Sequence, residues 1–124
     1  MTPTILIVED HDLLRASLSD WLAAAFNPCT ITTAADGLAA VEAAHTHQPQ
    51  LVLMDLDLPC LNGLEATRRI KAALPATQVV MLTMYEDQAH RADAAAAGAS
   101  AYVPKRNLGS DLVPVVNNLL QKTT

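Results

Sequence analysis

Short apolar runs alternate along the chain with longer segments in which apolar residues recur at helical spacing. Continuous runs of four apolar residues occupy positions 5–8, 51–54 and 79–82, and strands that are buried on both faces have this pattern. Weaker strand candidates lie at 30–34 and 100–103. Together the five runs favour a parallel sheet that is covered by helices on both of its faces.

The segments between and after these runs have the pattern of amphipathic helices. Apolar residues share one helix face in the segments around 14–25, 38–44, 64–74 and 112–120, and the segment 86–97 is rich in alanine, the strongest helix former. The chain order is then five consecutive strand–helix units, which is typical of an α/β protein.

Proline, glycine and serine mark several of the helix boundaries. Pro75 ends the third helix, and Gly98 stops the fourth because glycine readily adopts the left-handed conformation after a helix. We expect Ser110 to be the N-cap of the fifth helix, which places Pro114 in the first turn, where a proline is tolerated.

The order of the units limits the topology of the sheet. Crossovers between parallel strands are right-handed, so five units wind helices onto both faces of one open sheet. We expect a flavodoxin-like doubly wound (βα)5 fold with strand order 2-1-3-4-5, formed by a single domain over residues 1–124. In that order the carboxyl ends of the first and third strands lie side by side, where ligands bind in open α/β sheets.

Composition excludes several classes of function. The chain has 124 residues, which is the size of one domain, and its net charge of −5 comes from eight Lys and Arg against thirteen Asp and Glu. A nucleic-acid binder carries a basic surface, so we expect no direct nucleic-acid contact by this segment. No apolar stretch approaches the about 20 residues that cross a bilayer, so we expect a cytoplasmic protein without a membrane segment or a signal peptide.

Polar side chains stand at the carboxyl ends of four expected strands, and the topology brings them to one edge of the sheet. They are Glu9, Asp10, Asp55, Asp57, Thr83 and Lys105. Clustered carboxylates repel one another and need a cation, and oxygen ligands without His or Cys suit Mg²⁺. A carboxylate beside such an ion can attack phosphorus while the lysine holds a phosphoryl oxygen. The pattern therefore predicts the formation of an aspartyl phosphate.

Four segments together resemble the receiver domain of bacterial two-component response regulators, and the resemblance covers essentially the whole chain. They are the opening Ile5-Leu6-Ile7-Val8-Glu9-Asp10, the run from Met54 to Pro59 that closes at Asn62-Gly63, the pair Leu82-Thr83, and Gly98 to Lys105. The resemblance implies a CheY-like fold and a phosphorylatable regulatory domain rather than a separate enzyme.

The resemblance also implies roles for single residues. Asp55 is the expected phosphoacceptor for a phosphohistidine on a sensor histidine kinase. Asp10 and Asp55 are expected to bind Mg²⁺ through their side chains and Asp57 through its backbone carbonyl, while Glu9 acts through metal-bound water. Lys105 is expected to contact the phosphoryl group.

Two further residues have the positions of the family's switch. The resemblance implies that the Thr83 hydroxyl turns toward a phosphoryl oxygen and that Tyr102 packs inward when the threonine moves. Met84 and Tyr85 follow the threonine, where the family has a small residue and a residue that tunes attack by water. Met84 is therefore expected to narrow the approach to Asp55.

Two other functions remain open from the residues alone. Asp55-Leu56-Asp57 also resembles the DxD signature of haloacid-dehalogenase-type phosphohydrolases, in which Asp57 would be a general acid. A receiver-like module that binds partners without phosphorylation is the other alternative.

The output of the switch is the least determined part. The segments Glu9-Asp10-His11 and Thr83 to Asp87 are similar to receivers that precede a LuxR-type DNA-binding domain. This similarity allows two interpretations: a stand-alone receiver, or the amino-terminal part of a longer transcription regulator whose DNA-binding domain is absent from this chain. A homodimer also stays open.

Overall fold

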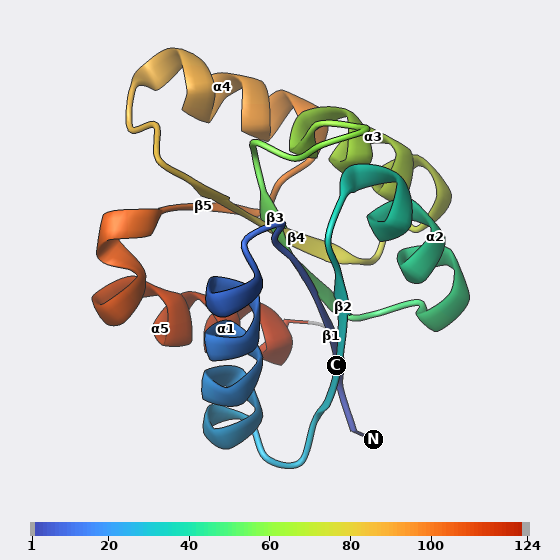
Figure 1. Cartoon of the computed structure of the whole chain (residues 1–124), viewed down its shortest axis with the longest axis vertical. Helices are drawn as coiled ribbons and strands as arrows, with labels where there is room; N and C mark the ends of the chain where they lie inside the picture. Colours follow the sequence, from blue (N-terminus) through green and yellow to red (C-terminus); the bar gives the residue numbers. More distant parts are fainter. Residues whose placement is uncertain (1, 123–124) are drawn as a thin grey trace.

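In the computed structural model of the chain, which describes residues 2–122, strands and helices alternate as expected (Figure 1). The strands are β1 (Thr4–Val8), β2 (Thr30–Ala34), β3 (Leu51–Asp55), β4 (Gln78–Thr83) and β5 (Ala101–Pro104). The helices are α1 (Asp12–Ala25), α2 (Gly37–His47), α3 (Gly63–Ala73), α4 (Gln88–Ala97) and α5 (Leu108–Gln121), with a 3-10 turn, η1 (Lys105–Asn107), before α5.

The strands form one sheet in the order β2-β1-β3-β4-β5, and every neighbouring pair is parallel. This confirms the predicted flavodoxin-like topology. Figure 1 shows α1 and α5 on one face of the sheet and α2, α3 and α4 on the other. The carboxyl ends of β1 and β3 are therefore adjacent. No helix within residues 2–122 is long and apolar enough to cross a membrane.

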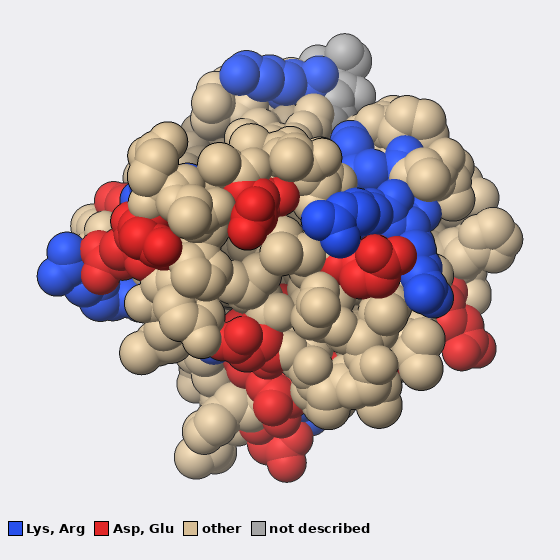
Figure 2. Space-filling view, turned by 90° about the horizontal axis from the view of Figure 1, so that it is seen from above, with Lys and Arg blue, Asp and Glu red and all other residues tan. Residues whose placement is uncertain are grey.

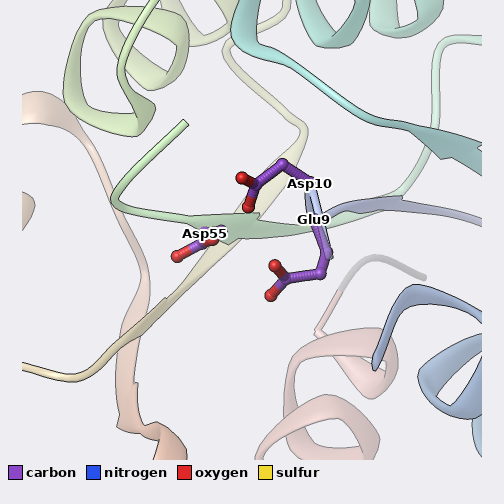
Figure 3. Close-up of side chains that lie close together, drawn as sticks. All are labelled: Glu9, Asp10 and Asp55. Atoms are coloured by element: carbon purple, nitrogen blue, oxygen red, sulfur yellow. The ribbon is translucent and has the colours of Figure 1, made fainter. Parts of the chain in front are cut away.

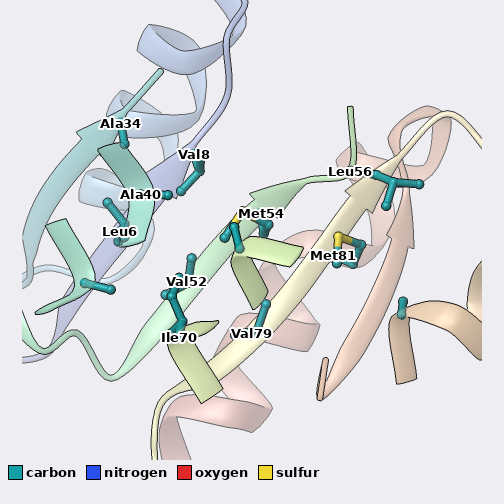
Figure 4. Packing of buried hydrophobic residues seen from close by; sticks show 13 residues of the cluster. Leu6, Val8, Ala34, Ala40, Val52, Met54, Leu56, Ile70, Val79 and Met81 are labelled. Atoms are coloured by element: carbon teal, nitrogen blue, oxygen red, sulfur yellow. The ribbon is translucent and has the colours of Figure 1, made fainter. Parts of the chain in front are cut away.

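Residues of each strand point alternately to the two faces, so the continuous apolar runs supply two cores. Ile5 and Ile7 of β1 pack in the cluster that α1 and α5 cover. Leu6 and Val8 pack in the other cluster, against residues of α2, α3 and α4 (Figure 4). Burying such a side chain stabilises the fold by about 1.5–3 kcal/mol. The two cores hold the strands rigidly, so their carboxyl ends present fixed positions.

The loop between β3 and α3 folds back tightly on the end of β3. The Gly63 N–H donates to the carbonyl of Leu56 at 2.9 Å, and a Cβ at Gly63 would lie only 2.2 Å from the carbonyl oxygen of Asp55. Only glycine fits such an approach. Asn62 caps α3 by accepting a hydrogen bond from the Glu65 N–H at 2.9 Å. The Asn62-Gly63 pair thus fixes the backbone that carries Asp55.

Two helix boundaries were predicted correctly and one was wrong. Gly98 follows α4 with φ 110°, and α3 ends before Pro75. Ser110 is not an N-cap, however, because η1 leads directly into α5, which begins at Leu108. Pro114 consequently lies in the second turn of α5 rather than in the first.

Candidate functional site

An acidic cluster lies at the carboxyl edge of the sheet, where β1 and β3 end side by side. Glu9 and Asp10 directly follow β1, and Asp55 is the last residue of β3. One carboxylate oxygen from each of these three residues lies within 4.8 Å of the other two (Figure 3). The topology therefore brings together three of the four acids that the sequence placed at this edge.

Asp57, the fourth acid, lines the same pocket but has a different position. Its side chain is exposed, and its N–H donates to Oδ1 of Asp55 at 3.3 Å. Among the described residues, the group whose carboxylate oxygens all lie within 4.8 Å of one another consists of Glu9, Asp10 and Asp55 and does not include Asp57. Asp57 thus contacts Asp55 through its backbone.

Lys105 connects two of the acids from the far end of the chain. It follows β5, and its Nζ lies 2.9 Å from Oε1 of Glu9 and 3.4 Å from Oδ1 of Asp55. Glu9 and Asp55 are both buried, and the lysine side chain is 17% exposed. Lys105 therefore partly compensates two buried negative charges, as charged groups in an interior require.

The charges of this cluster are not fully balanced. Burial and, to a smaller extent, the negative charge of Glu9 raise the pKa of Asp55 from 3.8 to about 7, although Lys105 and the Asp57 N–H act in the opposite direction. Burial alone would lower the pKa of Lys105, but its hydrogen bond to Glu9 and the charges of Asp55 and Glu9 raise it. Asp55 is thus held in surroundings that disfavour its own charge, which an additional cation would relieve.

The donor set fits a magnesium ion. Carboxylate oxygens are hard ligands, and Mg²⁺ uses one or two of them while it keeps several waters. The cluster opens into a pocket of about 460 Å³, which is large enough for such waters and for a phosphoryl group. The residues that could hold the ion are Asp10 and Asp55, with Glu9 and Asp57 beside them.

Thr83 and Tyr102, the two residues expected to form a switch, are connected through one backbone segment. Thr83 is buried at the end of β4, and its Oγ1 accepts a hydrogen bond from the Tyr85 N–H at 3.0 Å. The Tyr102 hydroxyl donates to the carbonyl of the same Tyr85 at 2.8 Å. Arg91 lies over the Tyr102 ring, 4.7 Å from its centroid. Tyr102 is thus held by contacts with the β4–α4 segment.

Two residues for which the sequence predicts no role, His11 and Arg15, contact Glu9, and Met84 lines the pocket. Met84 lines the pocket and is 72% exposed, and its effect on access to Asp55 stays a prediction. His11 lines the pocket too, and its N–H donates to Oε2 of Glu9 at 3.1 Å. Arg15 donates to the carbonyl of Glu9 at 2.8 Å. Nothing in the local sequence pattern pointed to this contact.

His90 is a further residue whose position the sequence did not reveal. Its ring stacks on that of Tyr85 with 4.2 Å between centroids, and its Nδ1 contacts Oδ1 of Asp87. These contacts brace the segment between β4 and α4. On the face seen in Figure 2, several Lys and Arg side chains gather in a patch at the right of the view, and Asp and Glu side chains border it.

Comparisons with known proteins agree with this geometry. The response regulator receiver domain family matches residues 5–117. Transcriptional regulatory protein LnrK of Bacillus subtilis is 38% identical over 112 residues, which cover 90% of this chain and 51% of LnrK. Response regulator protein VraR of Staphylococcus aureus is 34% identical over 116 residues, which cover 94% of this chain and 56% of VraR.

Solved structures show the same similarity in three dimensions. A LuxR-family two-component response regulator from Aurantimonas sp. superposes with a TM-score of 0.89 at 31% identity, covering 98% of this chain and 87% of that one. A CheY-like receiver domain protein from Methanospirillum hungatei, at 24% identity, shares the fold with a TM-score of 0.91 over 99% of this chain and 97% of its own. The chain belongs to the response regulator receiver domain family, and it spans about half the length of the curated relatives it matches.

Proposed function

We propose that the chain is the Mg²⁺-dependent phosphoacceptor of a two-component system. A phosphohistidine on a sensor histidine kinase transfers its phosphoryl group to Asp55, and the phosphorylated chain changes its output surface. The observation that carries this proposal is the buried Asp55, with the carboxylates of Glu9 and Asp10 and the Nζ of Lys105 around it. Family membership supports it independently.

Each residue of the cluster then has a part in the transfer. In the ionised form, an Asp55 carboxylate oxygen attacks phosphorus, an O–P bond forms, and the N–P bond to the histidine breaks, leaving the electron pair on the imidazole. Asp10 and Asp55 would hold Mg²⁺ with their side chains, the Asp57 carbonyl would add a ligand, and Glu9 would act through bound water. When bound, the ion neutralises the charge that develops on the phosphoryl oxygens.

Lys105 would contact the new phosphoryl group. Its Nζ is already 3.4 Å from Oδ1 of Asp55, so a short movement away from Glu9 brings it to a phosphoryl oxygen. A phosphoryl dianion competes well for a lysine, because charge-assisted hydrogen bonds are among the strongest in proteins.

Thr83 and Tyr102 would form the switch. The Thr83 hydroxyl accepts from the Tyr85 N–H, and on phosphorylation it would donate its own proton to a phosphoryl oxygen. A movement of Thr83 would disturb Tyr85, whose carbonyl holds the Tyr102 hydroxyl. The phosphoryl group thus favours a second arrangement of β4–α4 by a shift of populations.

The experiment is phosphorylation of the purified chain with Mg²⁺ and acetyl phosphate, followed by mass spectrometry. We expect one base-labile phosphoryl group on the wild type and on Asp93→Asn, a matched substitution of an exposed acid on α4, and none on Asp55→Asn. In NMR spectra the Tyr85 amide should shift on phosphorylation of the wild type and much less in Thr83→Val. Label that persists in Asp55→Asn would refute the site.

The same experiment separates the two alternatives. Steady turnover of an aryl phosphate, lost in Asp57→Asn, would indicate a phosphohydrolase. Failure of the wild type to bind Mg²⁺ or accept a phosphoryl group would indicate a binding module without phosphorylation. The matched family is a regulatory domain, which favours the phosphoacceptor.

Wider features of the regulator form part of the proposal. We propose that residues 1–124 act as one domain in the cytoplasm, that the phosphorylated form pairs as a homodimer, and that DNA contact belongs to another segment. LnrK is named a transcriptional regulatory protein, and a similar structure from Staphylococcus aureus a DNA-binding response regulator, which supports a role in transcription. Sedimentation with and without phosphorylation tests the dimer, and a gel shift of the 124-residue chain, expected to be negative, tests the DNA assignment.

A further inference from the structure

Arg15 of α1 contacts the backbone of Glu9, which lines the acidic pocket, and the proposed phosphoryl transfer assigns Arg15 no part. Its Nη1 donates to the backbone carbonyl of Glu9 at 2.8 Å, and its Nη2 is 2.7 Å from Oδ1 of Asp12. The arginine side chain is 22% exposed, whereas that of Asp12 is 87% exposed. One rigid, planar guanidinium thus bridges the first turn of α1 and the buried end of β1.

The other polar groups of Glu9 have partners elsewhere. Its N–H donates to the carbonyl of Ala34 at 3.1 Å, Oε1 contacts Lys105, and Oε2 accepts from the His11 N–H. Arg15 therefore supplies the donor for the Glu9 carbonyl. That carbonyl and the Asp10 N–H belong to one peptide plane, because the peptide bond is planar. Its orientation sets the direction in which the Asp10 side chain leaves the loop.

The loop needs such an anchor because it holds like charges together. Carboxylate oxygens of Glu9, Asp10 and Asp55 lie within 4.8 Å of one another, and like charges at this distance repel. A rotation of the Glu9–Asp10 peptide would move Asp10 away and relieve the repulsion. The charge-assisted hydrogen bond from Arg15 opposes this rotation.

We propose that Arg15 is a positioning residue of the cation site: it holds the Glu9–Asp10 peptide so that the Asp10 and Asp55 carboxylates stay close enough to bind one Mg²⁺ ion. This inference rests on the proposed function and extends it to a residue outside the acidic cluster. For the loss of Arg15, the inference predicts weaker Mg²⁺ binding, whereas the change in charge alone predicts stronger binding. Removing a positive charge near the site would by itself strengthen cation binding, whereas loss of the anchor weakens it.

The experiment is calorimetric titration of the 124-residue chain with Mg²⁺ for the wild type, Arg15→Ala, Arg15→Lys and Arg69→Ala. Arg69 is a matched control, because it also pairs with an acid of its own helix, Glu65, but lies on α3. We expect the Kd of Arg15→Ala to rise about tenfold, as when outer-shell partners of metal ligands are removed. Arg15→Lys keeps the positive charge but loses the planar guanidinium with its two contacts, so its Kd should rise less. The Kd of Arg69→Ala should not change.

Two more measurements distinguish positioning from a general loss of structure. Without metal, amide exchange at Asp10 and His11 should quicken in Arg15→Ala while amides of β3 stay protected. In phosphorylation assays, the Mg²⁺ concentration for half-maximal rate should rise, and the rate at saturating Mg²⁺ should stay near that of the wild type.

Each remaining outcome has a definite meaning. An unchanged or lower Kd in Arg15→Ala, with normal binding by the wild type, overturns the role of Arg15 and leaves the proposed function intact. Absence of Mg²⁺ binding by the wild type overturns both. Should Arg15→Ala fail to fold, Arg15→Lys decides, because it keeps the aliphatic stem and the charge, and an unchanged Kd there refutes the inference.

Discussion

The two edges of the sheet bury polar groups in different ways. At the amino edge, where β1, β3 and β4 begin, the Thr4 N–H donates to Oε1 of Gln50 at 2.7 Å, and the buried Thr77 hydroxyl donates to the carbonyl of Pro49 at 2.8 Å. The donors and acceptors of these two hydrogen bonds are neutral, and the charged Nζ of Lys71 nearby donates to the backbone carbonyl of Thr77 at 2.8 Å. Buried neutral groups with partners cost little, since protein hydrogen bonds replace those to water.

The carboxyl edge holds charges instead. Glu9 and Asp55 are buried there, and Lys105 is shared between them. Burial and repulsion raise the pKa of Asp55 to about 7, so its ionised form weakens the folded state. The comparison indicates that the amino edge stabilises the fold, while the carboxyl edge holds a buried carboxylate whose charge is only partly compensated.

The largest expected change in stability comes from removing the shared cation. Lys105→Met leaves two buried carboxylates without their lysine and should lower the free energy of unfolding by about 2–4 kcal/mol near neutral pH. The loss should shrink at about pH 5, where Asp55 is protonated. Urea unfolding at both pH values measures it, with Lys122→Met as the surface control. If Lys105→Met lost the same free energy of unfolding at both pH values, the loss could not come from the uncompensated charge of Asp55.

A smaller effect of opposite sign is expected at the acid itself. Asp55 has a raised folded pKa, so its contribution to stability is complete below about 4 and is lost as the pH rises through about 7. Asp55→Asn removes this loss and should stabilise the chain by about 1–3 kcal/mol at about pH 8, with little difference near pH 4. Thermal or urea unfolding across this range gives the difference. Destabilisation at high pH would show that the charge of Asp55 is well compensated.

The smallest effect is expected at the amino edge. Thr77→Val keeps the shape but removes the hydroxyl that bonds to Pro49, which should cost about 1–2 kcal/mol at every pH, because neither group titrates. Mg²⁺ affinity and phosphoryl incorporation should equal those of the wild type. If the loss of stability depended on pH, or if Mg²⁺ affinity changed, the two edges would not be energetically independent.

Local patterns in the chain determined most of the fold. Runs such as Leu51 to Met54 are apolar at every position because both faces of their strand are covered. Such a run can be identified from the local sequence alone, without knowledge of the elements that pack on it. The order of the units then fixed the topology, and with it the adjacency of Glu9, Asp10 and Asp55. The start of α5 was predicted at the wrong residue, because a 3-10 turn before a helix leaves no local signature comparable to a glycine or a proline.

Tertiary structure alone decided how the clustered groups act on one another. The Lys105 contact with Glu9 joins residues 96 positions apart, and the Arg15 contact with the Glu9 carbonyl depends on how α1 packs on β1. The raised pKa of Asp55 likewise arises from burial by residues distant in the chain. Sequence determines which groups reach the carboxyl edge, because strand ends are set by local patterns. Distances, desolvation and hydrogen-bond partners are properties of the packed chain, and they determine which acid carries the unfavourable charge.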